Sequence, residues 1–206
     1  MPDVSVIIVT WNSAPYIGAC LESILTHSGI HTLEIIVADN GSTDDTCERI
    51  SSGFPDVILL RWGANLGFPK ANNLAAKRAH GKYLFFLNPD TYLDNNAVES
   101  LRSHLEANPS LGIVGPGILS EKGNSIAVDA RSFPSLRGTL FRYFGLRSLL
   151  PHHPLFGSEY LHPAKRDTPQ SVECLTGAAL FMEAEFFRSL DGFDEQLPMY
   201  FEDMDL

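Results

Sequence analysis

The chain has 206 residues, which fits one domain. Hydrophobic residues make up 44% and charged residues 19%, as in an ordinary globular protein that can hold its core without disulfides or a structural metal. The formal net charge of −10 argues against broad binding to phosphate backbones, so we predict no nucleic-acid partner.

The cysteines and the apolar runs bear on the compartment. Cys20, Cys47 and Cys174 are widely spaced and outside any Cys-x-x-Cys pattern, which disfavours a zinc site or a disulfide framework and fits a reducing cytoplasm. The N-terminus lacks the basic and apolar regions of a signal peptide, and no apolar run reaches the ~18 residues of a membrane span. We therefore predict a cytoplasmic protein.

The first half of the chain alternates strand-like and helix-like segments. Buried runs of β-branched or aromatic residues predict strands, at 4–10, 34–38, 57–60 and 82–87. Helical spacing and capping residues predict helices, at 17–25, 42–50 and 67–79. This alternation predicts an α/β fold with a parallel central sheet flanked by helices.

From about residue 108 the pattern changes. Short antiparallel strands are predicted at 112–119 and 125–128, followed by an irregular functional loop region over 131–170. Regular structure returns at 172–182, with a helix over 183–190. The chain stops within a predicted helix start, so we expect further helices to follow in the complete protein.

Polar residues follow each of the four predicted strands of the first half. The segments are Thr10–Asn12, Asp39–Asp44, Asn65–Phe68 and Asn88–Asp90. In parallel α/β folds ligands bind beyond the carboxyl ends of the strands, so we expect these segments to meet at one functional edge. A single such loop would be explained as a turn, but four together favour a binding site.

The segment Asn88-Pro89-Asp90 is a candidate metal site. Mg²⁺ and Mn²⁺ prefer oxygen ligands and can complete their coordination with diphosphate oxygens and water. Taken alone the segment is typical of a turn, and its place beside three other polar strand ends favours the metal interpretation. We predict Asp90 as the metal ligand, with Asn88 supplying a nearby amide oxygen.

Two further acidic segments have both a structural and a functional interpretation. Asp39 ends a strand before a tight turn and helix cap, where its carboxylate can accept a hydrogen bond from a nucleobase N–H. The pair Glu202-Asp203 follows a glycine-containing elbow at 190–195; it can supply a general base for an acceptor hydroxyl or only complement a helix dipole. No GxGxxG or GxxxxGK[ST] pattern occurs, which disfavours a Rossmann dehydrogenase and a P-loop enzyme.

Seven segments carry a resemblance to a known family: VSVIIVTWN, IIVADNGSTDDT, NLGFPKANN, YLFFLNPDT, TGAALF, GFDE and YFEDMDL. Together they resemble glycosyltransferase family 2, above all its rhamnosyltransferase-like members. The resemblance implies a GT-A fold: a mostly parallel central sheet flanked by helices, with a smaller antiparallel acceptor-side portion. It implies one catalytic domain, with a nucleotide-sugar-binding half over 1–107 and an acceptor-side half over 108–206.

The implied reaction is an inverting, metal-dependent transfer of a sugar, with rhamnose as a candidate, in polysaccharide or cell-wall biosynthesis. The donor would be a dTDP- or UDP-linked sugar and the acceptor a glycan or lipid-linked glycan hydroxyl. By the same resemblance one set of residues binds the nucleotide: Thr10, Asn12, Asp39, Asp44, Asn65, Gly67 and Asn88. Asn88 and Asp90 occupy the family's Asp-x-Asp position for Mg²⁺ or Mn²⁺, where Asn88 removes one negative charge. Asp203, with Glu202 beside it, matches the catalytic base.

Two other functions stay open. A nucleotidyltransferase that forms nucleotide sugars would favour a glycine-rich basic loop after the first strand, where this chain has Thr10-Trp11-Asn12. An inactive nucleotide-sugar-binding homologue would keep the fold, and the presence of Asp90 and Asp203 counts against it.

Residues 137–156 combine three arginines with aromatic and leucine side chains. Such a segment can settle at an anionic membrane interface, which would place the protein peripherally at the inner face of the membrane. Alternatively, its aromatic side chains cover the acceptor site while the arginines face water.

Overall fold

The structure, a computed structural model, describes residues 1–30, 32–119, 130–131 and 168–197. The chain divides into two units, one formed by Met1–Pro116 and Gly177–Leu206 and the other by Gly117–Thr176. In the second unit, the described residues form one antiparallel pair of short strands, β6 (Ala130–Arg131) and β7 (Cys174–Leu175). The central sheet and the four polar strand ends belong to the first unit.

Among the described residues of the first unit, six strands form a sheet in the order β3-β2-β1-β4-β8-β5. Their bounds are β1 Val4–Thr10, β2 Leu33–Asp39, β3 Ile58–Arg61, β4 Tyr83–Leu87, β5 Ile113–Val114 and β8 Ala179–Glu183. The first four strands in this order are parallel to one another, and β8 is antiparallel to both β4 and β5. The prediction of a mostly parallel sheet with an antiparallel portion is confirmed.

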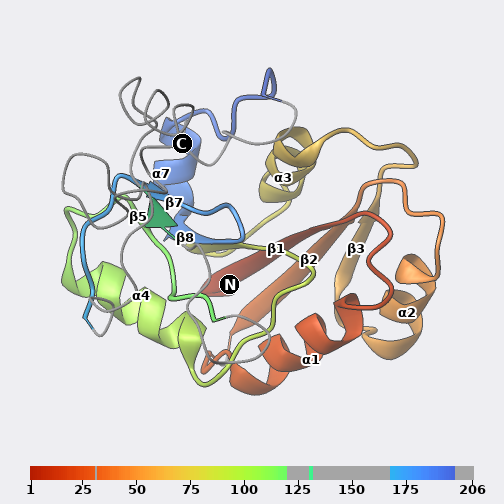
Figure 1. Cartoon of the computed structure of the whole chain (residues 1–206), viewed down its shortest axis with the longest axis horizontal. Coiled ribbons are helices and arrows are strands. Elements are labelled where there is room, and N and C mark those ends of the chain that lie inside the picture. The colour runs from red at the N-terminus through yellow and green to blue at the C-terminus, as the bar shows by residue number, and fades with distance from the viewer. Residues whose placement is uncertain (31, 120–129, 132–167, 198–206) are drawn as a thin grey trace, which may run out of the picture. The chain divides into compact units, whose positions relative to one another are not determined.

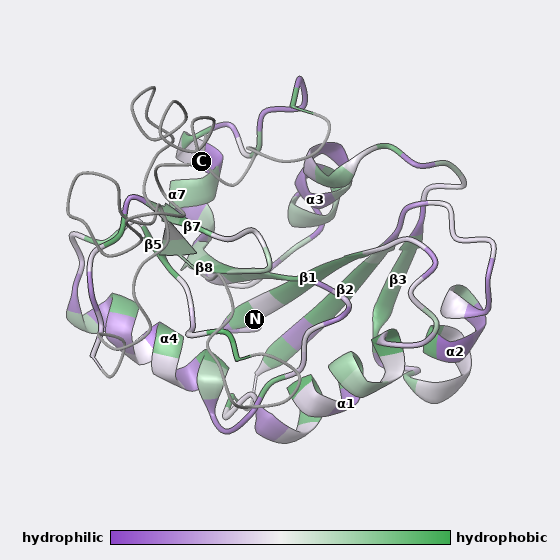
Figure 2. Cartoon of the chain, viewed as in Figure 1, coloured by the Kyte–Doolittle hydropathy of each residue, from purple (hydrophilic) through white to green (hydrophobic). Residues whose placement is uncertain are grey.

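Burial on both faces explains why the central strands form. Almost every side chain of β1, β2 and β4 is buried, and Figure 2 shows these strands in the hydrophobic colour. Complete burial of one Val, Leu, Ile or Phe side chain stabilises a fold by about 1.5–3 kcal/mol. The central sheet is therefore a rigid support for the loops that follow its strands.

Helices cover both faces of the sheet. Their bounds are α1 Ile17–His27, α2 Thr46–Gly53, α3 Phe68–Ala76, α4 Ala97–Ala107 and α7 Ala184–Ser189. Figure 1 shows α1, α2 and α4 on one side and α3 and α7 on the other. The side chains of β4, which alternate between the two faces of the sheet, agree with this arrangement. The Tyr83 hydroxyl donates to Glu106 of α4, whereas the Phe86 ring packs against Phe187 of α7.

The structure differs from the sequence predictions in three elements. No helix is predicted from the sequence between 91 and 107, yet α4 forms there and buries Val98, Leu101 and Leu105. Helix α2 begins at Thr46 with Asp45 as its N-cap, later than the predicted capping run at 42–44. The strand predicted at 112–119 shrinks to β5, and the one predicted at 125–128 lies outside the described residues.

No helix in the described part of the chain combines the length and the apolar character needed to cross a membrane.

Candidate functional site

The loops after β1 and β2 are tied together through Asn12. Its side-chain oxygen accepts a hydrogen bond from the Thr43 backbone N–H (2.8 Å), and its own N–H donates to Ser42 Oγ (2.9 Å). Asn12 has a φ of 52°, a left-handed conformation that asparagine adopts more readily than most residues. Asn12 therefore joins two strand-end loops into one surface.

Asp39 lies beneath that surface and is only 3% exposed. One carboxylate oxygen accepts from the N–H groups of Gly41 (3.2 Å) and Ser42 (3.1 Å), and the other accepts from Thr10 Oγ1 (3.3 Å). A carboxylate offers about four acceptor positions, so these three bonds leave about one, and the Cys47 thiol is a hydrogen-bond partner there. Asp39 and the fully buried Thr10 thus shape the turn after β2.

The turn after β2 requires glycine at position 41. Gly41 has a φ of 84°, and a Cβ atom there would lie 2.9 Å from the Ala64 carbonyl carbon. The close approach brings the loop after β3 against the loop after β2.

Asp44 links the same loops from the solvent side. Its oxygens accept from the N–H of Ala14 (3.1 Å) and from both the N–H (3.1 Å) and the hydroxyl of Thr46. The Thr46 hydroxyl bond is the largest cause that lowers the pKa of Asp44, partly opposed by desolvation. Asp44 therefore stays ionised at neutral pH, at the exposed start of α2.

The loop after β3 is held by Asn40, a buried residue next to Asp39. Asn40 donates to Asn65 Oδ1 (2.9 Å) and accepts from the Leu66 N–H (2.8 Å), while Asn65 Oδ1 also accepts from the Gly67 N–H (2.9 Å). Gly67 has a φ of 84° and is the N-cap of α3. Asn40 is not among the residues predicted for the site; in the sequence, only its place in the polar run after β2 points to it.

The turn after β4 differs from the other three. Its backbone is anchored at Asn88: the Asn88 N–H donates to Ala178 O (2.9 Å), and Asn88 O accepts from the Thr91 N–H (3.2 Å) and hydroxyl (2.7 Å). The side chains of Asn88 and Asp90, in contrast, form no hydrogen bond or ion pair within the described part of the chain. Two oxygen-bearing side chains of this anchored turn thus have no hydrogen-bond partner in the described part of the chain.

The free groups at this turn suit a hard cation only as part of a larger ligand set. The described residues contain no group of three or more His, Cys, Asp and Glu side chains that could hold a metal ion by themselves. Cys20, whose thiol lies 3.8 Å from Asn88 O, is not a suitable ligand, because burial and then the charge of Asp90 raise its pKa to about 12. An ion at Asp90 would need further oxygens from a bound ligand and water, as Mg²⁺ commonly does.

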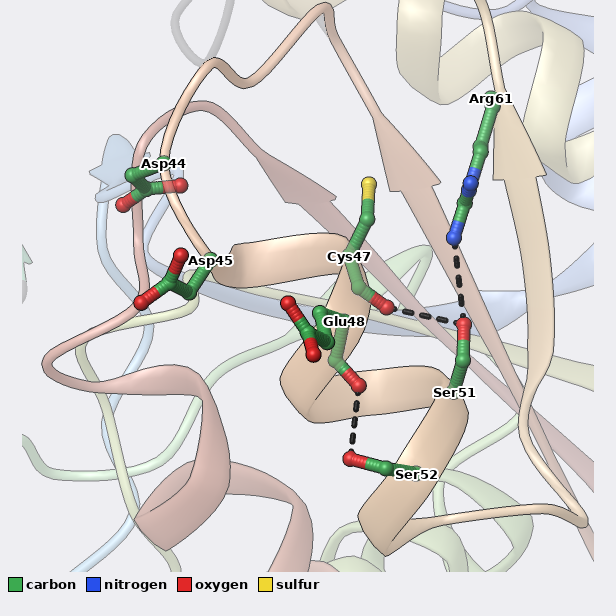
Figure 3. Close-up of a pocket in the computed structure, with 7 residues that line it drawn as sticks. All are labelled: Asp44, Asp45, Cys47, Glu48, Ser51, Ser52 and Arg61. Atoms are coloured by element: carbon green, nitrogen blue, oxygen red, sulfur yellow. Dashed lines mark hydrogen bonds between the residues drawn. The ribbon is translucent and has the colours of Figure 1, made fainter.

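A hollow of about 520 Å³ lies beside α2 and the end of β3 (Figure 3). Asp44 stands at one end, and at the other Arg61 donates to Ser51 Oγ (3.2 Å). Burial, followed by a hydrogen bond to Asp39 and the charge of Asp39, raises the pKa of the Cys47 thiol in this hollow. The hollow therefore adjoins the predicted nucleoside residues Asp39 and Asp44.

The structure thus brings together the predicted residues at the ends of β1, β2 and β3, and it places Asn88 and Asp90 at the end of β4, the strand beside β1. Glu202, Asp203 and the segment 137–156 lie outside the described residues.

A sheet of this order, with antiparallel β8 beside β4 and polar loops at the carboxyl edge, is the fold of the GT-A glycosyltransferases. A mannosyltransferase from Pyrobaculum calidifontis, solved with GDP-Man and Mn²⁺, matches with a TM-score of 0.65 and 21% identity over 99% of this chain and 50% of that one. TarS 1-349 from S. aureus, solved with UDP-GlcNAc, matches with a TM-score of 0.59 and 20% identity over 99% of this chain and 51% of that one. The chain spans about half the length of these solved proteins.

Sequence comparison identifies the family. Residues 5–168 match the family described as Glycosyl transferase family 2. An N-acetylglucosaminyl-diphospho-decaprenol L-rhamnosyltransferase from Mycobacterium tuberculosis is 31% identical over 222 aligned residues, which cover all of this chain and 70% of that protein. A low-salt glycan biosynthesis hexosyltransferase from Haloferax volcanii is 24% identical over an alignment that covers all of this chain and 60% of that protein. The chain belongs to glycosyl transferase family 2.

Proposed function

We propose that this chain binds a nucleoside-diphosphate sugar and transfers the sugar, with inversion, to a hydroxyl of a glycan or lipid-linked glycan. The observation that carries the proposal is the anchored turn after β4, in a member of this family: the side chains of Asn88 and Asp90 there have no hydrogen-bond partner among the described residues. The name of the mycobacterial relative makes L-rhamnose and a lipid-linked N-acetylglucosamine the first donor sugar and acceptor to test.

The nucleoside is proposed to lie on the joined loops after β1 and β2. The Asn12 amide nitrogen can donate to a carbonyl of the base, and an Asp39 carboxylate oxygen can accept from a base N–H in place of the Cys47 thiol. Both dTDP and UDP present such an N–H. The diphosphate is proposed to lie near Asn65 and Gly67, because the start of α3 presents backbone N–H groups that favour an anion.

Asp90 is proposed to hold Mg²⁺ or Mn²⁺, with Asn88 beside it and the remaining ligands from the diphosphate and water. When bound, the ion would neutralise the diphosphate leaving group. The oxygen chemistry of the two free side chains supports this, and so does the Mn²⁺ in the Pyrobaculum structure of the same fold.

The acceptor hydroxyl is proposed to lose its proton to Asp203 as its oxygen attacks the anomeric carbon. The new C–O bond forms on the face opposite the diphosphate, whose bond to that carbon breaks, so the configuration inverts. This role of Asp203, with Glu202 next to it, rests on the sequence motif.

Titration with UDP and dTDP, with and without Mn²⁺, tests the site, the nucleotide and the metal together. We expect metal-dependent binding that Asp90→Ala abolishes without a loss of stability, since Asp90 has no described partner to lose. Asp94→Ala is the matched control, because it removes an exposed carboxylate from the same loop. Equal Mn²⁺-dependent affinity in wild type and Asp90→Ala would refute the metal assignment. Binding without transfer of any sugar would favour the inactive homologue.

The membrane interpretation of 137–156 stays a prediction. Binding to anionic vesicles that weakens with salt and with Arg142→Glu plus Arg147→Glu would support it, and failure to sediment with such vesicles at low salt would leave the acceptor-side interpretation.

A further inference from the structure

A strained elbow follows α7 and precedes the predicted catalytic pair in the chain. Asp191 (φ 61°) and Gly192 (φ 80°) are both left-handed, and for a residue with a side chain this conformation is unfavourable. The elbow closes α7, since the Gly192 N–H donates to Phe187 O (3.1 Å). A conformation of this kind persists only where neighbouring contacts hold it.

Asn73 of α3, on a distant part of the chain, supplies those contacts. Its Oδ1 accepts from the Phe193 N–H (3.0 Å), and its Nδ2 donates to Phe193 O (2.9 Å) and to Glu195 Oε1 (3.2 Å). Asn73 is only 8% exposed. One amide thereby satisfies both backbone groups of Phe193, as a neighbouring strand would.

The fit between Asn73 and the elbow is close. A Cβ atom at position 192 would lie 2.5 Å from Asn73 Oδ1, so only glycine admits the amide there. Next to it, the Phe193 ring is 2% exposed and meets the rings of Phe68, Phe86 and Phe187 at centroid distances of 5.1 to 5.9 Å. The aromatic contacts fix the position of Phe193, and Asn73 fixes the path of its backbone.

The same helix is tied to the donor edge. α3 begins directly after Gly67, in the loop that Asn40 and Asn65 hold against the end of β2. Asn73 stands less than two turns further along α3. A single short helix therefore connects the proposed diphosphate loop with the elbow that leads, along the chain, to Glu202 and Asp203.

We propose that Asn73 is a positioning residue, which fixes the elbow of residues 191–195 on α3 and so sets the starting point of the chain that carries the catalytic base. The inference rests on the proposed function, in which Asp203 is that base. It predicts that the loss of Asn73 lowers kcat while the affinity for the donor nucleotide stays close to that of the wild type, because the bonds of the donor-edge loops remain.

The test uses the whole protein with Asn73→Asp, which keeps the size and the acceptor for the Phe193 N–H but loses the donor to Phe193 O and Glu195. Asn72→Ala is the matched control: Asn72 is also buried on α3, but its Nδ2 donates to Phe68 O within the helix and does not reach the elbow. A third variant combines Asn73→Asp with Glu195→Gln, which restores one bond with donor and acceptor exchanged.

Hydrogen exchange of residues 190–197, the Kd for the nucleoside diphosphate with Mn²⁺, and kcat are measured on each variant. In Asn73→Asp we expect faster exchange of the elbow and at least a tenfold lower kcat, with a Kd within about twofold of the wild type. In the double variant, exchange and kcat should return part of the way to the wild-type values. In Asn72→Ala, neither the exchange of the elbow nor kcat should change selectively. Unchanged exchange of the elbow in Asn73→Asp would show that the Asn73 hydrogen bonds do not hold the elbow. Faster exchange with unchanged kcat would refute the positioning role. A wild-type protein that transfers no sugar would overturn the proposed function and the positioning role with it. The exchange result would still decide whether Asn73 holds the elbow.

Discussion

Replacement of Asn12 tests whether the joined loops after β1 and β2 form the nucleoside platform. Asn12→Gly removes the bonds that the side-chain oxygen accepts from Thr43 N (2.8 Å), Thr43 Oγ1 (3.3 Å) and Asp44 N (3.4 Å), but it tolerates the φ of 52°. At about 0.5–1.5 kcal/mol for a hydrogen bond of ordinary length, and less for the two long ones, the loss is about 1–2 kcal/mol. Asn12→Ala adds the cost of a left-handed backbone, about 1 kcal/mol more.

Urea unfolding measures these losses, and calorimetry with UDP or dTDP measures their effect on binding. Because a nucleotide would have to order the released loops, we expect the Kd of Asn12→Gly to rise by a factor of about 5 to 30, the equivalent of 1–2 kcal/mol. Asn12→Ala should bind no more tightly than Asn12→Gly. If Asn12→Gly loses stability as expected while its nucleotide affinity is unchanged, the loops are a structural joint and the nucleoside binds elsewhere.

Three further outcomes follow from the site and the sheet. Asn88→Asp should tighten Mn²⁺ binding by restoring a charge beside Asp90, and an unchanged or weaker affinity by calorimetry would make Asn88 a turn residue only. Asp203→Asn should lower turnover by roughly 10²–10⁴-fold with near-normal donor binding; a larger effect of Glu202→Gln in the same assay would reverse the assignment of the pair. Desolvation of Glu34 would raise its pKa, but hydrogen bonds from Ser5 and from the backbone and ring of His80 outweigh it, and the pKa is lowered from 4.5. The resulting stability is present above that value and is lost as the pH falls through the lowered pKa. Denaturant unfolding should therefore show a shallower loss of stability at acid pH for Glu34→Gln than for the wild type, and parallel acid limbs would contradict this.

The sequence determined the central sheet because its strands are buried on both faces. Apart from Ser5 and Lys82, the runs 4–10 and 82–87 are apolar or β-branched, so their pattern depends little on which elements surround them. The polar residues after these strands were equally visible, because parallel strands must deliver their ends to one edge.

Short elements could not be predicted from the sequence pattern in the same way. α4 buries only Val98, Leu101 and Leu105 among polar residues, and β5 is two residues long; both depend on contact with β8, which comes far later in the chain. The pairing of β8 with β4 and β5 is a choice among distant partners, and the pattern of any one segment does not specify it.

Tertiary structure alone decided what each polar side chain at the edge does. From the sequence, Asn12, Asp39 and Asp44 were equivalent to Asn88 and Asp90 as candidates for ligand contact. The side-chain oxygens of the first three accept hydrogen bonds from backbone N–H groups, from the same turn in Asp39 and across to the neighbouring loop in Asn12 and Asp44. The side chains of the last two have no hydrogen-bond partner among the described residues. Which donors lie within reach of Asn12 and Asp44 depends on how loops about 30 residues apart in the chain meet, and the sequence of one loop does not specify this.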